Sequence, residues 1–324
     1  MPDSLATARE DVAIANRILA NEGLLDAFGH VSMRHPAVPE RFLISRHRAP
    51  ELVQPADIVE LNLDGEPAVP TSFRLYGERI IHAAIYAAIH EQGKTTVLVV
   101  NGGTEQRGPH AVLGGHTLTA KPQGVDIARK LGNALVAPVM PFSIAGGHLR
   151  AKTPGSVHLP GPIFAAVNEA VVDSMVVNGF KNIVLMGEHG GGQKELAEVA
   201  KKMDAKYSPQ GVHVFFCGDF YDKTQAEFYA WLISNNLPPS THGGIADTSL
   251  MMYLGGDAWV RKDKMVPGDP WLPPGATRDP KVPLVDNGVI GDPRPSTPEY
   301  GQRYFELRTR IAVAQIQTMI AAVK

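Results

Sequence analysis

The sequence predicts an α/β protein: a three-layer α/β/α domain with a mainly parallel sheet, preceded by a small α+β segment. Two observations support this fold class. From residue 95 onward, apolar runs of strand length such as TTVLVV (95–100) and NIVLMG (182–187) alternate with helical segments. This alternation is typical of a parallel sheet with helices on both faces. Before that point, short stretches of alternating apolar and polar residues are separated by glycine and proline, which indicates short strands and turns.

Residues 1–90 are predicted to hold two helices with short strands between them. The first helix runs through about Glu22 and ends at Gly23, because apolar residues recur at helical spacing up to that point. Strands are expected in FGHVSMRHP (28–36), RFLISRHRAP (41–50) and DIVELNLDGEP (57–67). A second helix is expected over about residues 73–92, with one apolar face made of Ile80, Ile81, Ala84, Ile85 and Ala88.

Residues 91–324 are predicted to form the α/β/α domain. Strands are expected at 95–100, 134–142, 182–187 and 212–218, and helices at 119–132, 163–180 and 193–207. The last helix has Thr297 as its N-cap and Pro298 as its first residue. Its apolar stripe runs through Phe305, Ile311, Ile316 and Ile320. The Pro- and Gly-rich residues 266–295 before it are expected to form an ordered excursion or a subunit contact.

Composition excludes several classes of function. A net charge of −2 gives no broad field that would attract nucleic acid or an anionic membrane, so we expect a small-molecule ligand. The single Cys217 rules out an internal disulfide and a cysteine zinc cluster, which fits a reducing compartment. No apolar run approaches the roughly 18 residues of a membrane span, and the first residues lack a signal-peptide pattern. The expectation is a soluble cytoplasmic protein.

Four polar segments are candidates for the functional site. Ligands of doubly wound sheets collect at the carboxyl ends of the strands, where residues 101–117, 187–193 and 218–222 are expected, and residues 241–249 form a fourth candidate. His189 lies in a glycine-rich turn between a strand and a helix. Together with Glu105 and His116 it would make a three-ligand set with an open position, as a catalytic ion requires. Each histidine taken alone is more typical of a packed or solvated residue.

These segments resemble the creatininase (creatinine amidohydrolase) family. GGTEQRGPHAVLGGHT (102–117) is similar to the family's Gly-Ser/Thr-Glu-Gln-His-Gly-Pro-His followed by Leu-Gly-Thr-Asp-Thr, and GEHGGGQ (187–193) to its Asn-Gly-His-Gly-Gly-Asn turn. HLRAKTPGSVHLPG (148–161) is similar to its His followed by Pro-Gly-Thr. THGGIADTSLMMYL (241–254) is similar to its His-Ala-Gly and Glu-Thr-Ser-Leu-Met-Leu segment. The four motifs occur in the family's order, and the resemblance covers about residues 90–324.

The resemblance implies a two-metal site from which this sequence departs. Glu105 and His189 match metal ligands of the family, whereas the bridging Asp is His116, the second-ion His is Arg107, and an acidic position is Gly191. A guanidinium cannot donate to a metal, and an imidazole does not bridge two ions as a carboxylate does. We therefore expect one divalent ion, Zn or Mn, on Glu105, His116 and His189, with Arg107 supplying positive charge. The alternative is a degenerate site. Glu188 is either an extra ligand or a solvated turn carboxylate.

The resemblance also implies a metal-dependent hydrolase that cleaves a non-peptide or cyclic amide C–N bond of a small molecule with water activated by the metal. His242 and Asp247 stand at the family's positions near the substrate, Asp247 in place of the usual Glu. A helix cap is the structural alternative for Asp247. Arg107 is a third catalytic candidate, able to hold an oxyanion or a substrate carboxylate, with a salt bridge as its alternative. Substrate contacts are expected from His110, His148 and Tyr221.

The amino-terminal residues, about 1–90, resemble the opening third of the class II aldolase/adducin family. The matching residues include Gly29, His30, Ser32, Ser45 and Glu78, but the His-x-His zinc pair of those aldolases is missing. The resemblance therefore implies a truncated, accessory segment or a gene join. Lyase activity from this segment, or a non-catalytic small-molecule-binding protein, remains the alternative function. By resemblance we also expect a homo-oligomer.

Overall fold

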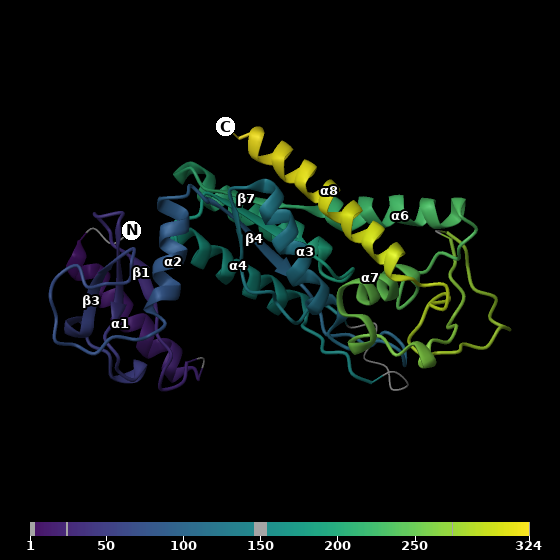
Figure 1. Cartoon of the computed structure of the whole chain (residues 1–324), viewed down its shortest axis with the longest axis horizontal. Coiled ribbons are helices and arrows are strands. Elements are labelled where there is room, and N and C mark those ends of the chain that lie inside the picture. The colour runs from purple at the N-terminus through teal and green to yellow at the C-terminus, as the bar shows by residue number, and fades with distance from the viewer. Residues whose placement is uncertain (1–3, 24, 146–153, 274, 324) are drawn as a thin grey trace. The chain divides into compact units, whose positions relative to one another are not determined.

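The computed structural model describes residues 4–23, 25–145, 154–273 and 275–323 (Figure 1). The chain divides into two compact units. The first comprises Met1–Thr95 and Asp173–Lys181, and the second comprises Thr96–Val172 and Asn182–Lys324. The boundary that we place between residues 90 and 91 stays a prediction. None of the helices in the described ranges is long and apolar enough to cross a membrane.

The first unit contains a small antiparallel sheet of three strands in the order β1-β2-β3. Its helix α1 (Leu5–Asn21) is capped by the Ser4 side chain and buries Ala8 and Val12 against Leu43 and Ile58 of the sheet. The elements occur as the sequence predicts, and the remaining bounds are β1 (Ser32–Arg34), β2 (Arg41–Ser45), β3 (Ile58–Asn62) and α2 (Arg79–His90).

Helix α2 differs from its prediction in two respects. It starts at Arg79 rather than near residue 73, and all of the predicted apolar face except Ala88 is exposed, with Ile81 61% exposed. The opposite face is buried: Tyr86 packs among the core residues that include Phe42, and its hydroxyl is 2.9 Å from Ser32 Oγ. Because α2 carries apolar residues on both sides, periodicity alone selects the wrong face.

The second unit contains a parallel sheet of four strands, as the sequence predicts, and their order is β5-β4-β6-β7. Every residue of the central strand β4 (Thr96–Asn101) is buried, which explains its continuous apolar run. The other strands are β5 (Ala134–Val136), β6 (Asn182–Gly187) and β7 (His213–Phe216).

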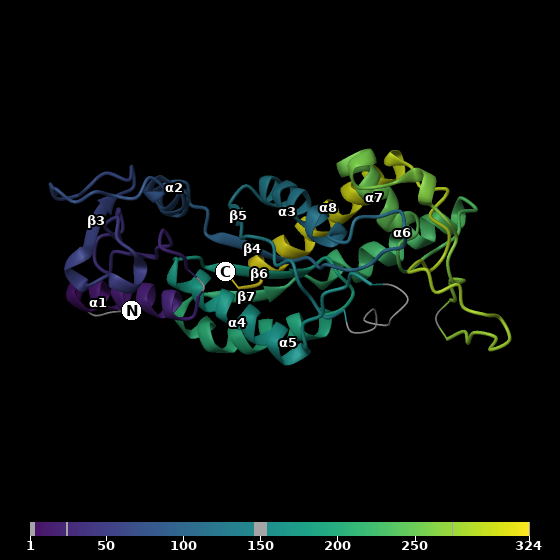
Figure 2. The ribbon, with the colours of Figure 1, turned by 90° about the horizontal axis from the view of Figure 1, so that it is seen from below.

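Helices cover both faces of this sheet, which makes the three layers of the predicted α/β/α fold (Figure 2). On one face, α3 (Gly115–Leu131) and α8 (Pro298–Ala321) pack together, and Ile127 and Ile316 share a core with Leu98 of β4. The other face carries α4 (Gly161–Val177) and α5 (Gln193–Tyr207). Thr297 caps α8 as predicted, accepting a hydrogen bond from the Tyr300 N–H.

Two further helices are α6 (Asp222–Ser234) and α7 (Ile245–Gly255), which the sequence analysis did not predict. Helix α7 lies against α8 and is buried on nearly all sides, polar Thr248 and Ser249 included, so it has no one-sided periodicity to reveal it. Helix α3 begins four residues earlier than expected, at Gly115, and this places His116 in its first turn.

Candidate metal centre

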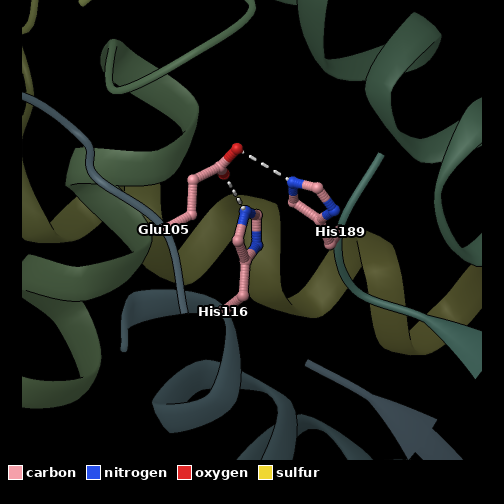
Figure 3. Close-up of side chains that lie close together, drawn as sticks. All are labelled: Glu105, His116 and His189. Atoms are coloured by element: carbon pink, nitrogen blue, oxygen red, sulfur yellow. Dashed lines mark hydrogen bonds and ion pairs between the residues drawn. The ribbon is translucent and has the colours of Figure 1, made fainter. Parts of the chain in front are cut away.

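The candidate centre forms where two neighbouring strands end. Asn101, the last residue of β4, pairs with Gly187, the last residue of β6, so the segments that follow them leave the sheet side by side. The first segment carries Glu105 and leads to His116 on α3, and the second carries His189 before α5. Figure 3 shows these three side chains pointing toward one another.

The three side chains form a buried cluster with the donor atoms of a metal site. Glu105 Oε1 lies 3.0 Å from His189 Nε2, and its Oε2 lies 3.1 Å from His116 Nε2. One ligand atom from each residue lies within 4.8 Å of the others, and within the described ranges no second group of this kind is found. One carboxylate and two imidazoles are a donor set that suits zinc and similar ions. The set fits a divalent ion.

The turn that carries His189 depends on its glycines. Gly192 has a φ of +97°, and a Cβ added at Gly191 would lie 1.9 Å from the carbonyl oxygen of Ile144. The backbone therefore has no room for a side chain at position 191, where some relatives by resemblance have an acidic ligand. His189 Nδ1 lies 3.0 Å from Ser143 Oγ, 3.0 Å from the Gly191 N–H and 3.2 Å from the Gly191 carbonyl oxygen. In the tautomer whose Nδ1–H donates to one of these oxygens, Nε2 is available to bind a metal.

Glu188 is buried rather than solvated, so the expectation of a solvated turn carboxylate is wrong. Its Oε1 accepts hydrogen bonds from Arg308 at 2.7 Å and from Thr119 at 3.0 Å, and its Oε2 contacts His116 Nδ1. Burial raises the pKa of Glu188, but the charges of His116 and Arg308 outweigh it and hold that pKa well below its usual range. The turn side chain is thus an ionised partner of a candidate ligand.

The pKa of His116 results from opposing effects. Burial and the charge of Arg107 lower it, whereas Glu188 and Glu105 raise it, and the carboxylates prevail. In the metal-free protein His116 therefore holds a proton more tightly than a free imidazole does. An ion that binds here must displace that proton.

Arg107 is buried beside the cluster. Its Nη2 contacts the ring of His116 and lies 3.6 Å from Asp247 Oδ1. Burial raises the pKa of Asp247, but the charges of Arg107 and the nearby histidines outweigh burial and leave that pKa below its usual value, so Asp247 is ionised. Its Oδ2 accepts the Gly243 N–H at 2.8 Å, at the start of α7. Asp247 thus holds the backbone just before this helix and faces the cavity.

His242 and Tyr221 line the cavity, and His110 does not. The Nε2 of His242 is 2.6 Å from the Gln106 carbonyl oxygen, and its Nδ1 is 3.7 Å from Glu105 Oε2. Burial raises the pKa of Tyr221 to about 12, so its hydroxyl stays protonated. His110 is fully buried, 2.9 Å from Thr248 Oγ1, and burial lowers its pKa to about 4. His148 lies outside the described residues.

The cavity beside the cluster has a volume of about 320 Å³, the size of a small-molecule site. Its walls include residues of α6 and α8 that the sequence analysis did not single out, since no local motif marks them. Tyr304 and Arg308 lie four residues apart and therefore share one face of α8, which is the sequence feature that could have indicated them. The cavity residues from α6 and α8 are Gln225, Tyr229, Tyr304 and Arg308.

Comparison with known proteins identifies the class to which this fold and site belong. Residues 83–316 match the family model of creatininase, described as creatinine amidohydrolase, and the chain belongs to this family. Membership supports metal-dependent amide hydrolysis as its chemistry. Residues 10–95 match the model of the class II aldolase and adducin N-terminal domain. Both resemblances found in the sequence are thereby confirmed.

Solved structures agree on the fold. A mutant creatininase has a TM-score of 0.59 and 21% identity, covering 72% of this chain and 94% of its own. A structure described as "Creatininase Mn" has a TM-score of 0.57 and 22% identity over the same shares, and so does a mutant creatininase of "Zn-Zn type". A putative creatinine amidohydrolase from Bacteroides fragilis has a TM-score of 0.53 and 19% identity, covering 69% and 89%.

One curated relative matches part of the chain. The decarboxylase tropJ of Talaromyces stipitatus is 42% identical over 71 residues, which are 21% of this chain and 27% of the decarboxylase. The chain thus spans about a quarter of that relative.

Proposed function

We propose that this protein is a metal-dependent amidohydrolase that cleaves a small, non-peptide or cyclic amide and uses one divalent ion, zinc or manganese. The observation that carries the proposal is the buried cluster of Glu105, His116 and His189 at the wall of a cavity of about 320 Å³. The metals are those in the names of the related structures.

Three features support one ion rather than two. Arg107 offers only N–H donors, so it cannot be a ligand. His116 points Nε2 toward Glu105 and Nδ1 toward Glu188, and an imidazole in this position serves one ion. Position 191 has no room for a side chain, because a Cβ there would lie 1.9 Å from the Ile144 carbonyl oxygen. The second ion would thus lack ligands on several sides.

The remaining side chains have roles that follow from their contacts. A bound divalent ion polarises an amide carbonyl and lowers the pKa of water. Asp247, ionised and lining the cavity, accepts a proton from the attacking water. His242 donates its Nε2–H to the Gln106 carbonyl oxygen, and its Nδ1 lies on the Glu105 side. As an imidazolium it would give its Nδ1 proton to the leaving nitrogen, and the proton that Asp247 takes from water would then restore it. Tyr221 keeps its proton and can donate a hydrogen bond to the substrate.

Arg107 acts through its neighbours in this proposal. It contacts His116 and Asp247 and is not among the residues that line the cavity. Its fixed positive charge keeps Asp247 ionised and in place. Substrate contacts from His110 and His148 stay predictions, as do a homo-oligomer and an accessory role for residues 1–90. The lone, buried Cys217 supports a cytoplasmic location.

The decisive experiment is metal content per chain, measured by mass spectrometry on protein purified without added metal, beside a His189→Ala variant. We expect about one ion per chain, lost in the variant, and a metal-dependent release of amine or acid from a panel of small cyclic and linear amides. Two ions per chain would contradict the one-ion proposal. No ion, even after zinc or manganese is supplied, would favour the degenerate, non-catalytic alternative.

A further inference from the structure

A buried chain of contacts connects the C-terminal helix to the candidate metal centre. Arg308 on α8 donates from Nη1 to Glu188 Oε1 at 2.7 Å, and Glu188 Oε2 in turn contacts His116 Nδ1. All three residues are buried, with Arg308 2% and Glu188 5% exposed. The contact joins residues 120 positions apart in the sequence.

Each member of this chain is held by further contacts. The guanidinium of Arg308 lies over the ring of Phe220, 4.2 Å from its centroid, and 5.4 Å from that of Tyr304. The carboxylate of Glu188 also accepts a hydrogen bond from Thr119 Oγ1 at 3.0 Å. Glu188 therefore has both oxygens engaged, one by α3 and α8 and the other by His116. Such an arrangement leaves the carboxylate little freedom to rotate.

The geometry settles which group can accept the Nδ1 proton of His116. Arg107 Nη2 also contacts the ring, at both of its nitrogens. A guanidinium carries donors only, so it cannot accept a ring proton, and it would have to yield its place at Nε2 to a bound ion. Glu188 is thus the acceptor that the structure places at Nδ1, while Nε2 faces Glu105 at 3.1 Å. A histidine that donates one ring N–H to a carboxylate presents its other nitrogen to a metal in a fixed orientation. The GEHGGGQ turn has Glu188 where the family motif has glycine, so this device belongs to this chain.

We propose that Glu188 and Arg308 are positioning residues of the metal centre: Glu188 accepts the Nδ1–H of His116 so that Nε2 binds the ion, and Arg308 holds the Glu188 carboxylate in place. This inference rests on the proposed function, because it assigns His116 as a ligand. The competing explanation is an ion pair that only stabilises the fold.

Zinc affinity of the purified full-length chain, measured by competition with a chelator, distinguishes the two explanations. Glu188→Gln keeps the size of the side chain and removes its charge, and we expect zinc to bind about 10–100-fold more weakly. Arg308→Lys keeps the charge but loses the planar contact with Phe220, and we expect a smaller loss in the same direction. Circular dichroism confirms that each variant is folded before its affinity is compared.

Asp126→Asn is the matched control. Asp126 lies on α3, and its carboxylate, like that of Glu188, accepts a hydrogen bond from α8, in this case from Thr309 Oγ1 at 2.8 Å, but it is not a cavity residue. We expect its zinc affinity to stay within about twofold of the parent. A folded Glu188→Gln variant that binds zinc as tightly as the parent would overturn the positioning role.

A second measurement separates this inference from the proposed function. The ¹⁵N chemical shifts of His116 in the metal-free protein report which ring nitrogen carries a proton and whether it is hydrogen-bonded. We expect a protonated, hydrogen-bonded Nδ1 in the parent and its change in Glu188→Gln. If the parent binds neither zinc nor manganese, the proposed function fails whatever the shifts show. If the parent binds zinc but Nδ1 is unprotonated in both proteins, the positioning role fails alone.

Discussion

The two units of the chain use histidines differently. In the first unit, His30 stacks on Tyr76 with ring centroids 4.1 Å apart, and His47 packs on the same ring at 4.9 Å. In the second unit, His116 and His189 share the carboxylate of Glu105. Aromatic neighbours pack on an imidazole without compensating a charge, whereas a shared carboxylate orients two imidazoles toward one point. The comparison teaches that a carboxylate shared by two histidines, rather than the number of histidines, marks the candidate metal centre.

The largest expected effect follows directly from this comparison. His189→Ala should abolish metal binding and lower amide hydrolysis by more than about 100-fold, because loss of a ligand exceeds the cost of losing an outer partner. His30→Ala in the first unit should leave both unchanged. Metal content and the hydrolysis rate of the two variants, measured side by side, check the prediction. If His30→Ala loses metal, the ion is bound in the first unit, and this result would favour the aldolase-like alternative.

The fold of the second unit could be predicted well because its buried strands are unbroken apolar runs. Helix α5 follows its amphipathic pattern from Gln193 to Tyr207, and α8 starts at the predicted cap. The helices α6 and α7 were missed, since α7 buries most of its circumference and so has no polar face to define a period. Tertiary packing, rather than local pattern, determines such a helix.

The candidate site could be predicted only where its residues belong to local motifs. Glu105, His116 and His189 follow strand ends and sit among glycines, so the sequence indicates them. Arg308 lies 120 residues from Glu188 in the sequence, and its spacing from Tyr304 on α8 indicates a shared helix face but not the distant carboxylate with which it pairs. The burial of Glu188 was also missed for this reason: a turn carboxylate is expected in water unless its distant cation is known.

Two apolar stripes, one in each unit, provide the next comparison. Ile316 on α8 is fully buried in the core that includes Leu98, so Ile316→Ala should lower the free energy of unfolding by about 2–5 kcal/mol. Ile81 on α2 is 61% exposed, and Ile81→Ala should change it by less than about 0.5 kcal/mol. Urea unfolding of both variants measures the difference. A large loss for Ile81→Ala would mean that its face is covered in solution.

A fully buried and a partly exposed arginine give a smaller contrast. Arg107, which is 2% exposed, contacts Asp247 and His116, whereas Arg48 of the first unit has a side chain that is 33% exposed and pairs with Asp57. Arg107→Gln should reduce hydrolysis by about 10–100-fold with the ion retained, and Arg48→Gln should not. The rates and the metal content of both variants test this contrast.

A related variant tests whether Arg107 alone excludes a second metal ion. Arg107→His restores the imidazole of the family motif, yet we expect the metal content to stay at about one per chain. The reason is that Gly191 has no space for a further ligand, and His116 does not bridge. Mass spectrometry of the variant gives the count. Two bound ions would show that Arg107 alone keeps the second ion out.

The smallest expected effect concerns a neutral histidine in each unit. Burial lowers the pKa of His82 to about 4, with the charge of His30 adding to the effect, and burial lowers that of His110 to about 4 against the opposing charge of Asp247. When the pH falls below 6.5, the pKa of these histidines in the unfolded chain, the unfolded chain binds protons that the folded protein does not bind. Both therefore lower the free energy of unfolding as pH falls from 6.5 toward 4.

For His110, which is fully buried, this loss amounts to on the order of 1–2 kcal/mol between about pH 7 and about pH 5. His110→Gln cannot take up that proton, so its free energy of unfolding should fall less than that of the parent over the same interval. Urea unfolding at the two pH values measures the difference between the slopes. Equal slopes would mean that His110 is protonated in the folded protein, which requires Asp247 to compensate its charge. In the second unit a carboxylate would then determine the charge of His110 as well as that of His116, which would widen the contrast with the first unit.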